Sequence, residues 1–262
     1  MLKKLHLLII TLFLVLMIPV AASATLYGVS WDDKLITIDE ATGVGSEIGS
    51  LDTNMAAFGL SFYGGSLYTF DQYRNVVVEL SVIDGSTIAT YDVGINTAGE
   101  GSIAFDSNGL GYLTRSAGGT GSLWTFDLQT LTSDMKINDV SGYNFDGLDF
   151  DSSGTLYAKQ QNNGDIFTID TATFGTSFYL ENALGNNDSG PVSGLTFDAL
   201  DNMYFEHDNY LYFNGVKFDN SIGYSISGLE FAGEPSVPEP ATMLLLGTGL
   251  VGLVCFRRKI KK

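Results

Sequence analysis

The sequence predicts an all-β domain, a five-bladed β-propeller whose ring is closed by pairing of the N- and C-terminal strands. Three observations predict it. A segment ending in phenylalanine recurs five times, a tyrosine-bearing segment follows it at a regular interval, and the two ends of the pattern complement each other. Sheets that repeat about every 40 to 50 residues are typical of propeller blades, because each small sheet buries its faces only against its neighbours.

The first segment places a variable residue between an apolar residue and a phenylalanine, as in "GLSF", "SIAF", "GLDF", "GLTF" and "GLEF". The tyrosines of the second segment are 41, 44, 45 and 47 residues apart. A third run such as "LITID" or "IFTID" ends in a turn-forming residue, and fourth-strand candidates such as "SEIGSL" follow. The repeated residues are Phe62, Phe105, Phe150, Phe197 and Phe231, and Tyr27, Tyr68, Tyr112, Tyr157 and Tyr204.

These segments have the composition of strands. They are four to six residues long, rich in Phe, Tyr, Ile and Val, and separated by Gly, Asn, Asp and Ser. No window between residues 25 and 233 has the apolar periodicity of a helix. Aspartates at the strand ends are expected to cap turns by accepting backbone N–H groups. They are Asp39, Asp106, Asp127, Asp151, Asp170 and Asp198.

The ends of the pattern predict how the ring closes. The first unit begins at its tyrosine segment, whereas the last phenylalanine segment, residues 227–231, has no tyrosine segment after it. Together the two ends complete one blade, and their pairing leaves few exposed sheet edges. Five copies of each segment predict five blades, and six blades remain the alternative if one blade is degenerate.

Charge and residue counts exclude several classes of function. The chain holds 30 Asp and Glu against 13 Lys and Arg, a net charge of −17, which makes nucleic acid an improbable partner. The single cysteine, Cys255, lies in the apolar C-terminal stretch, and His207 is the only histidine beyond residue 6. The domain therefore lacks the usual ligands of a zinc site and has one candidate base for a serine nucleophile.

The N-terminal 24 residues have the pattern of a secretory signal peptide. Two lysines precede an apolar run, and Ala22 and Ala24 fit a small-residue cleavage site. Cleavage after Ala24 leaves a propeller domain over residues 25–233, followed by a linker over residues 234–240. A retained N-terminal membrane helix is the alternative.

The C-terminal residues read as a short membrane segment with a basic tail. Residues 241–256 carry no charge, and 16 helical residues reach about 24 Å, a minimal span for a core of about 30 Å. Residues 257–262 hold five basic side chains, which by the positive-inside bias form a cytoplasmic tail. This helix would attach the protein to the membrane before any processing.

Residues 237–240, "VPEP", followed by a short hydrophobic segment and a basic cluster in a chain with a signal peptide, resemble the PEP-CTERM sorting signal of Gram-negative bacteria that make extracellular polysaccharide. The resemblance implies that an exosortase, a membrane protease, recognises Pro238, Glu239 and Pro240. It also implies secretion through the inner membrane to the cell envelope, surface or extracellular matrix. The alternative interpretation is a permanent single-pass membrane anchor. The repeats "GLDFDSSGTLY" and "IFTID" are similar to NHL-like repeats of bacterial exported propellers.

Four carboxylates on or just before the innermost strands are the candidate catalytic residues: Glu100, Asp146, Asp149 and Glu230. Two of them converging at about 5 to 10 Å across the channel mouth would suit acid/base work on a glycosidic bond. With water they could instead hold Ca²⁺, although no cofactor is the expectation. Exposed aromatics in loops could stack on sugar rings. They are Trp31, Tyr63, Tyr73 and Tyr143.

The sequence therefore predicts an exported binding or structural module, directed toward the extracellular polysaccharide with which it is sorted. The alternative is a carbohydrate-active hydrolase or lyase that uses the channel-mouth carboxylates. A matrix protein without a defined ligand is a third interpretation. Propellers host all three kinds of function, so the fold does not choose between them.

Overall fold

The structure, a computed structural model, describes residues 24–52, 55–96, 99–117, 120–141, 143–161, 164–181, 183–184 and 192–233. Within these residues the chain forms strands and turns and no helix. The strands are β1 Thr25–Ser30, β2 Lys34–Ile38, β3 Gly45–Ser50, β4 Ala57–Tyr63, β5 Ser66–Asp71, β6 Val76–Leu80, β7 Thr87–Tyr91, β8 Glu100–Phe105, β9 Gly111–Ala117, β10 Thr120–Asp127, β11 Thr132–Ser141, β12 Phe145–Phe150, β13 Leu156–Gln160, β14 Ile166–Ile169, β15 Thr176–Leu180, β16 Val192–Phe197, β17 Met203–His207, β18 Tyr210–Phe213, β19 Val216–Ser221 and β20 Ile226–Ala232.

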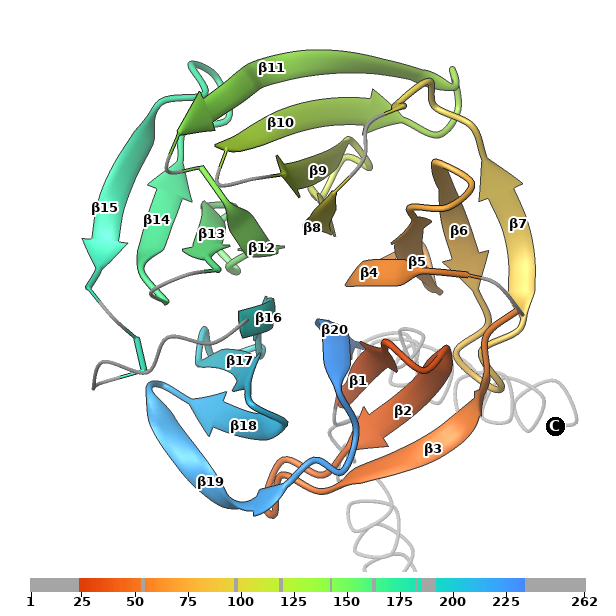
Figure 1. The fold of residues 1–262 in the computed structure, drawn as a ribbon, viewed down its shortest axis with the longest axis vertical. Coiled ribbons are helices and arrows are strands. Elements are labelled where there is room, and N and C mark those ends of the chain that lie inside the picture. Colours follow the sequence, from red (N-terminus) through yellow and green to blue (C-terminus); the bar gives the residue numbers. More distant parts are fainter. Residues whose placement is uncertain are drawn as a thin grey trace, which may run out of the picture. The chain divides into compact units, whose positions relative to one another are not determined.

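The strands form five antiparallel four-stranded sheets arranged around a centre (Figure 1). Blade 1 has the order β20-β1-β2-β3, and blades 2 to 5 contain β4 to β7, β8 to β11, β12 to β15 and β16 to β19. The strands β20, β4, β8, β12 and β16 are innermost, and the last strand of each blade lies at the rim (Figure 1). The prediction of five blades is confirmed.

Ring closure occurs as the sequence predicts. Strand β20 pairs antiparallel with β1, so that Leu229 faces Gly28 and Phe231 faces Leu26. A strand from one end of the domain thus completes a blade made by the other end. Blade 1 gains the inner strand that its N-terminal segment lacks, and the ring has no open junction.

The inner strands of neighbouring blades approach so closely that glycine is required between them. A Cβ on Gly59 would lie 2.5 Å from the Ile103 backbone nitrogen, and one on Gly228 would lie 2.4 Å from the Gly59 carbonyl carbon. Gly59 also has φ +62°, at a bulge in the pairing of β4 with β5. Glycine supplies both the space and the backbone conformation. The "G" of the repeated "GLSF" pattern is therefore a packing residue.

The variable residue of the pattern bonds the inner strand of the next blade. The Phe105 N–H donates to Ser61 Oγ at 3.2 Å, and the Phe231 N–H donates to Thr196 Oγ1 at 3.3 Å. Asp149 Oδ2 accepts the Phe197 N–H at 3.1 Å. Each bond satisfies a backbone N–H on the inner edge of an innermost strand. That edge has no partner strand to accept the hydrogen bond.

The remaining two phenylalanine amides complete this set. The Phe62 N–H donates to the Glu230 carboxyl, again from one blade to the next. Between blades 3 and 4 the variable residue is Ala104, which has no acceptor. There the Phe150 N–H donates at 2.7 Å to Oδ1 of Asp149 in its own strand. Asp149 thus replaces the acceptor that Ala104 does not provide.

The core is divided into five apolar clusters, each between two neighbouring blades. Between blades 2 and 3, for example, Phe58 and Phe70 pack with Ile103 and Phe126, all nearly inaccessible to solvent. Four of the repeated phenylalanine side chains, those of Phe105, Phe150, Phe197 and Phe231, contact aromatic rings of the same interfaces. The Tyr68 and Phe105 ring centroids, for example, lie 5.0 Å apart. Apolar burial therefore stabilises the contact between blades more than the interior of any blade.

The turn aspartates cap as predicted. Asp39 Oδ1 accepts N–H groups of Ala41 at 3.0 Å and Thr42 at 2.7 Å. The Thr42 hydroxyl and amide hold the pKa of Asp39 below its ordinary value. Equivalent bonds occur at Asp106, Asp127, Asp151, Asp170 and Asp198. These six carboxylates shape turns between strands.

Replacing the packing glycine should be far costlier than replacing a turn glycine of similar conformation. For Gly64→Ala, where φ is +61° with nothing within 4 Å, we expect a loss of about 1 kcal/mol from backbone strain alone. For Gly59→Ala we expect a loss above about 3 kcal/mol, because the new Cβ also meets the backbone of β8. Urea unfolding of both variants measures the difference. Equal losses would contradict the close approach of β4 and β8.

Candidate functional site

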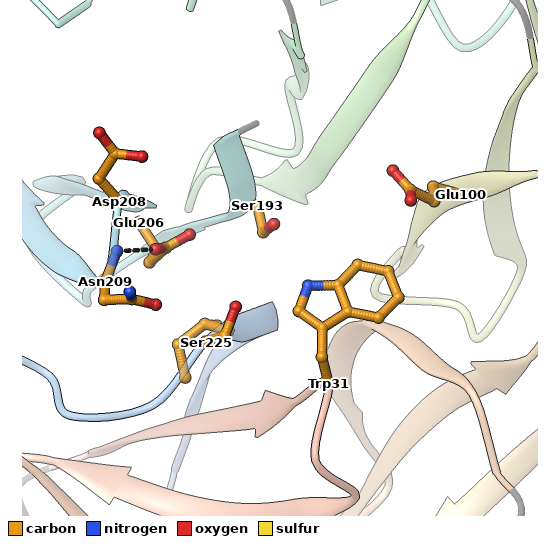
Figure 2. Close-up of a pocket in the computed structure, with 8 residues that line it drawn as sticks. Trp31, Glu100, Ser193, Glu206, Asp208, Asn209 and Ser225 are labelled. Atoms are coloured by element: carbon orange, nitrogen blue, oxygen red, sulfur yellow. Dashed lines mark hydrogen bonds between the residues drawn. The ribbon is translucent and has the colours of Figure 1, made fainter. Parts of the chain in front are cut away.

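A pocket of about 220 Å³ opens on the face of the ring where the innermost strands begin (Figure 2). Strands β8, β16 and β20 start there, and the second strands β1 and β17 end there. Blade 1, blade 5 and blade 3 all contribute, and blade 3 is a neighbour of neither of the others. The pocket therefore lies at the mouth of the central channel. Its lining residues are Trp31, Glu100, Ser193, Glu206, Asp208, Asn209, Ser225 and Ile226.

Trp31 is the aromatic residue of this pocket. It follows β1 in a tight turn held by the Asp33 N–H, which donates to the Ser30 carbonyl at 3.1 Å. The backbone N–H of Trp31 donates to the Ser225 carbonyl at 2.9 Å, and this bond joins the turn to the segment that enters β20. The indole is 39 % exposed and lies between Glu100 on one side and Ser193 and Ser225 on the other (Figure 2). A flat apolar ring is thus presented among polar groups.

Glu206 lies at the opposite side of the pocket, on β17, and is 4 % exposed. Its Oε1 accepts the Asn209 N–H (Figure 2). Burial raises the pKa of the Glu206 carboxyl to about 7, against the lowering effects of the Asn209 amide and the Lys159 charge. Lys159 is itself fully buried, with its Nζ 5.2 Å from the centre of the Phe205 ring, and burial lowers its pKa to about 7.

Glu100 is held by an amide network from blade 4. The Gln161 side-chain N–H₂ donates to Glu100 Oε2 at 2.8 Å, and the Gln161 side-chain carbonyl accepts from the Asn144 amide. The Gln161 backbone N–H donates to the Asn144 carbonyl at 2.8 Å. These bonds fix the Glu100 carboxylate at the start of β8, on the pocket side.

The structure places the four predicted carboxylates in different parts of the channel region. Of these, only Glu100 lines the pocket. Asp146 is buried near the start of β12, where its charge acts on Lys159. Asp149 and Glu230 lie deeper along their strands, where both accept phenylalanine amides of neighbouring blades. Burial raises the pKa of Asp149 to about 7, and burial together with the Asp149 charge raises the pKa of Glu230 well above its ordinary value.

The other aromatic candidates lie away from the pocket. Tyr63 stacks on Phe105 with ring centroids 5.3 Å apart, and the Tyr143 hydroxyl bonds Thr176 Oγ1 at 2.8 Å. Tyr73 is 69 % exposed on a turn after β5 and does not line the pocket. Trp31 is therefore the one predicted aromatic that the fold places in the site.

Sequence reasoning missed Glu206, Asp208 and Asn209. They belong to "YFEHDN", a segment in which only His207 was considered, and His207 is buried with Nε2 3.5 Å from Asp208 Oδ2. The segment carries one signal that could have found them: four polar or charged residues in succession, residues 206–209, at the end of a strand of the repeat.

In the part of the chain that the structure describes, no group of three or more His, Cys, Asp or Glu side chains is placed to hold a metal ion. Nor does any helix among the described residues have the length and apolar character needed to cross a membrane. The signal peptide over residues 1–24 lies outside the described residues except for Ala24. The linker beyond residue 233, the membrane segment and the basic tail lie outside them too, and all remain predictions.

Solved propellers of low sequence identity share the fold. A chain of the nidogen/laminin complex is 15 % identical with a TM-score of 0.55, over 80 % of this chain and 98 % of that chain. A candidate gluconolactonase is 13 % identical with a TM-score of 0.52, over 81 % of this chain and 79 % of that chain. Virginiamycin B lyase from Staphylococcus aureus is 14 % identical, over 79 % of this chain and 74 % of that one, and its TM-score of 0.46 is too low to support an argument. No curated protein matches the sequence.

The buried carboxyl of Glu206 gives the site a testable pH dependence. Its folded-state pKa lies above the ordinary value of 4.5, so the folded protein loses stability as the pH rises from about 4.5 to about 7. Glu206→Gln removes that loss. We expect the variant to gain up to about 3 kcal/mol relative to the original protein between about pH 5 and about pH 8, at about 1.4 kcal/mol per pKa unit.

Urea unfolding of both proteins at the two pH values measures this gain. Glu47→Gln, on the exposed part of β3, is the control for the loss of a surface carboxylate. A Glu206→Gln effect that is the same at both pH values would contradict the burial of an ionisable carboxyl in the pocket wall.

A family model described as the PEP-CTERM protein-sorting motif matches residues 236–259. The match includes Pro238, Glu239 and Pro240, which lie outside the described residues. The motif implies processing by an exosortase and an exported, envelope-associated protein. The chain is a five-bladed β-propeller that carries a PEP-CTERM protein-sorting motif.

Proposed function

We propose that this exported propeller is a carbohydrate-binding module and that the channel-mouth pocket holds a sugar of the polysaccharide with which the protein is sorted. The observation that carries the proposal is the exposed Trp31 indole inside a pocket of polar groups. Large exposed apolar rings in concave polar sites commonly provide a stacking surface for a ligand. The apolar C–H face of a pyranose is a suitable partner for such a ring.

The polar groups around Trp31 suit the hydroxyl groups of a sugar. Glu100, Glu206 and Asp208 supply carboxyl oxygens, and Ser193, Asn209 and Ser225 supply hydroxyl and amide groups. No lysine or arginine is among the lining residues. Phosphorylated and carboxylated sugars would meet carboxylates without a compensating cation, so the pocket favours neutral sugars and amino sugars.

A second candidate is a carbohydrate-active hydrolase, favoured because two of the pocket's carboxyls, those of Glu100 and Glu206, lie in different environments. Burial keeps Glu206 partly protonated near neutral pH, as a general acid requires. Glu100 is held by the Gln161 amide and could serve as the base or nucleophile. In this case the pair would be Glu100, one of the four carboxylates singled out from the sequence, with Glu206, which was not among them.

Removing the indole should weaken recognition. On an array of neutral and amino-sugar oligosaccharides, we expect Trp31→Ala to weaken binding at least about fivefold, since the loss of a stacked aromatic contact costs on the order of 1 kcal/mol or more. Trp31→Phe should restore part of the affinity. Tyr73→Ala removes an exposed aromatic outside the pocket and should bind like the original protein.

Binding that survives Trp31→Ala would contradict the proposed site. The same incubations report on the second candidate, because a hydrolase releases reducing ends and a binding module does not. Reducing ends that disappear in Glu206→Gln, with Trp31-dependent binding retained, would establish the hydrolase in place of the module.

A further inference from the structure

Two buried carboxylates face the central channel from blades that are not neighbours. Asp149 lies on β12 of blade 4 and Glu230 on β20 of blade 1, each at the variable position of the repeat and each 8 % exposed. They are close enough for the Asp149 charge to act on Glu230. The channel is narrow, since Cα atoms of β4 lie within 8 Å of Cα atoms in both β12 and β16 across the ring.

The two carboxylates differ in how their oxygens are satisfied. Asp149 accepts the N–H groups of Phe150 and Phe197 and is also bonded by the Thr196 hydroxyl. Glu230 accepts the Phe62 N–H, and its Oε2 is buried without a hydrogen-bond partner. A carboxylate oxygen that is buried and unpaired costs free energy, so a group that neutralises it would stabilise the protein.

The buried cations of the described residues do not neutralise this pair. Lys159 lies by Phe205, where Glu206 and Asp146 act on it. Arg115 lies over the rings of Phe58 and Phe70, at 5.1 Å and 5.2 Å from the ring centres. No ion pair among the described residues includes Asp149 or Glu230. The two carboxyl groups therefore have no cationic side chain among the described residues as a partner.

A proton is one way to neutralise Glu230. A protonated Oε2 becomes a donor and then needs an acceptor of its own. A cation requires no acceptor and makes use of the free oxygen. A divalent ion neutralises both carboxylates at once, and a site made only of oxygen suits a hard ion that completes its shell with water.

We propose that the channel holds a calcium ion between Glu230 and Asp149, with water as the remaining ligands. Glu230 contributes its free Oε2, and Asp149 contributes the one lone pair that two amides and the Thr196 hydroxyl leave available. The ion links blade 1, which joins the two ends of the domain, to blade 4 across the ring. Calcium suits this site better than magnesium, which requires near-octahedral ligands and gives up its water reluctantly. This inference does not depend on sugar binding in the pocket.

The experiment is a thermal unfolding titration of the purified full-length chain, stripped with EDTA and then supplied with calcium chloride. We expect Tm to rise saturably, by about 5 to 10 °C at a calcium concentration about a hundredfold above Kd. Glu230→Gln keeps an acceptor for the Phe62 N–H and removes the charge, so it should abolish the shift. Glu206→Gln removes a buried carboxyl from the pocket layer and should leave the shift intact.

Magnesium at the same concentrations should raise Tm less than calcium does. The proposal would be overturned if calcium does not shift the Tm of the original protein and Glu230→Gln raises Tm whether or not calcium is present. Those two results together would mean that a proton neutralises the pair. A shift that Glu206→Gln abolishes and Glu230→Gln retains would place the ion in the pocket and would overturn it equally.

Discussion

The hydrogen bond from a phenylalanine N–H of one inner strand to a side chain of the preceding blade is the constraint on which the ring depends. An inner strand pairs with its own blade on one edge and has no ladder on the other, so its amide must find an acceptor across the blade interface. Ser61, Asp149, Thr196 and Glu230 provide one at four of the five interfaces. The glycine two residues earlier lets the backbones come close enough for these bonds to form. Phenylalanine packing, ring closure and the width of the channel all follow from that approach.

The fold could be predicted because its determinants repeat. Phe and Tyr recur at fixed places in each unit, and the incomplete first and last units require each other, as the pairing of β20 with β1 confirms. The roles of Asp149 and Glu230 could not be predicted in this way. The sequence places both on innermost strands, but only the contact between strands determines that they accept Phe197 and Phe62 amides.

The pocket was less predictable, for a related reason. Its residues come from blades 1, 3 and 5, and the repeat relates each blade to its own strands without indicating which loop ends meet over the channel. Trp31 could be found because an exposed aromatic in a turn is unusual in itself. Glu206 could not, because its position at the end of β17 is occupied by Val29, Phe70, Thr114 or Lys159 in the other blades. Glu206 thus belongs to the site from a position that varies between the repeats.

The same variability separates two functions along the channel. In the deeper layer, hydroxyl and carboxyl groups at positions that the fold requires join neighbouring blades. The outer layer does not join blades, and it presents the indole and the carboxylates of the pocket.

The central claim is most directly tested by native-state hydrogen exchange of the amides of Phe62, Phe105, Phe150, Phe197 and Phe231. The account predicts that all five exchange only through global unfolding, as slowly as amides in the central ladders of the blades. Exchange of these amides at rates typical of exposed turns, while the ladders stay protected, would contradict it.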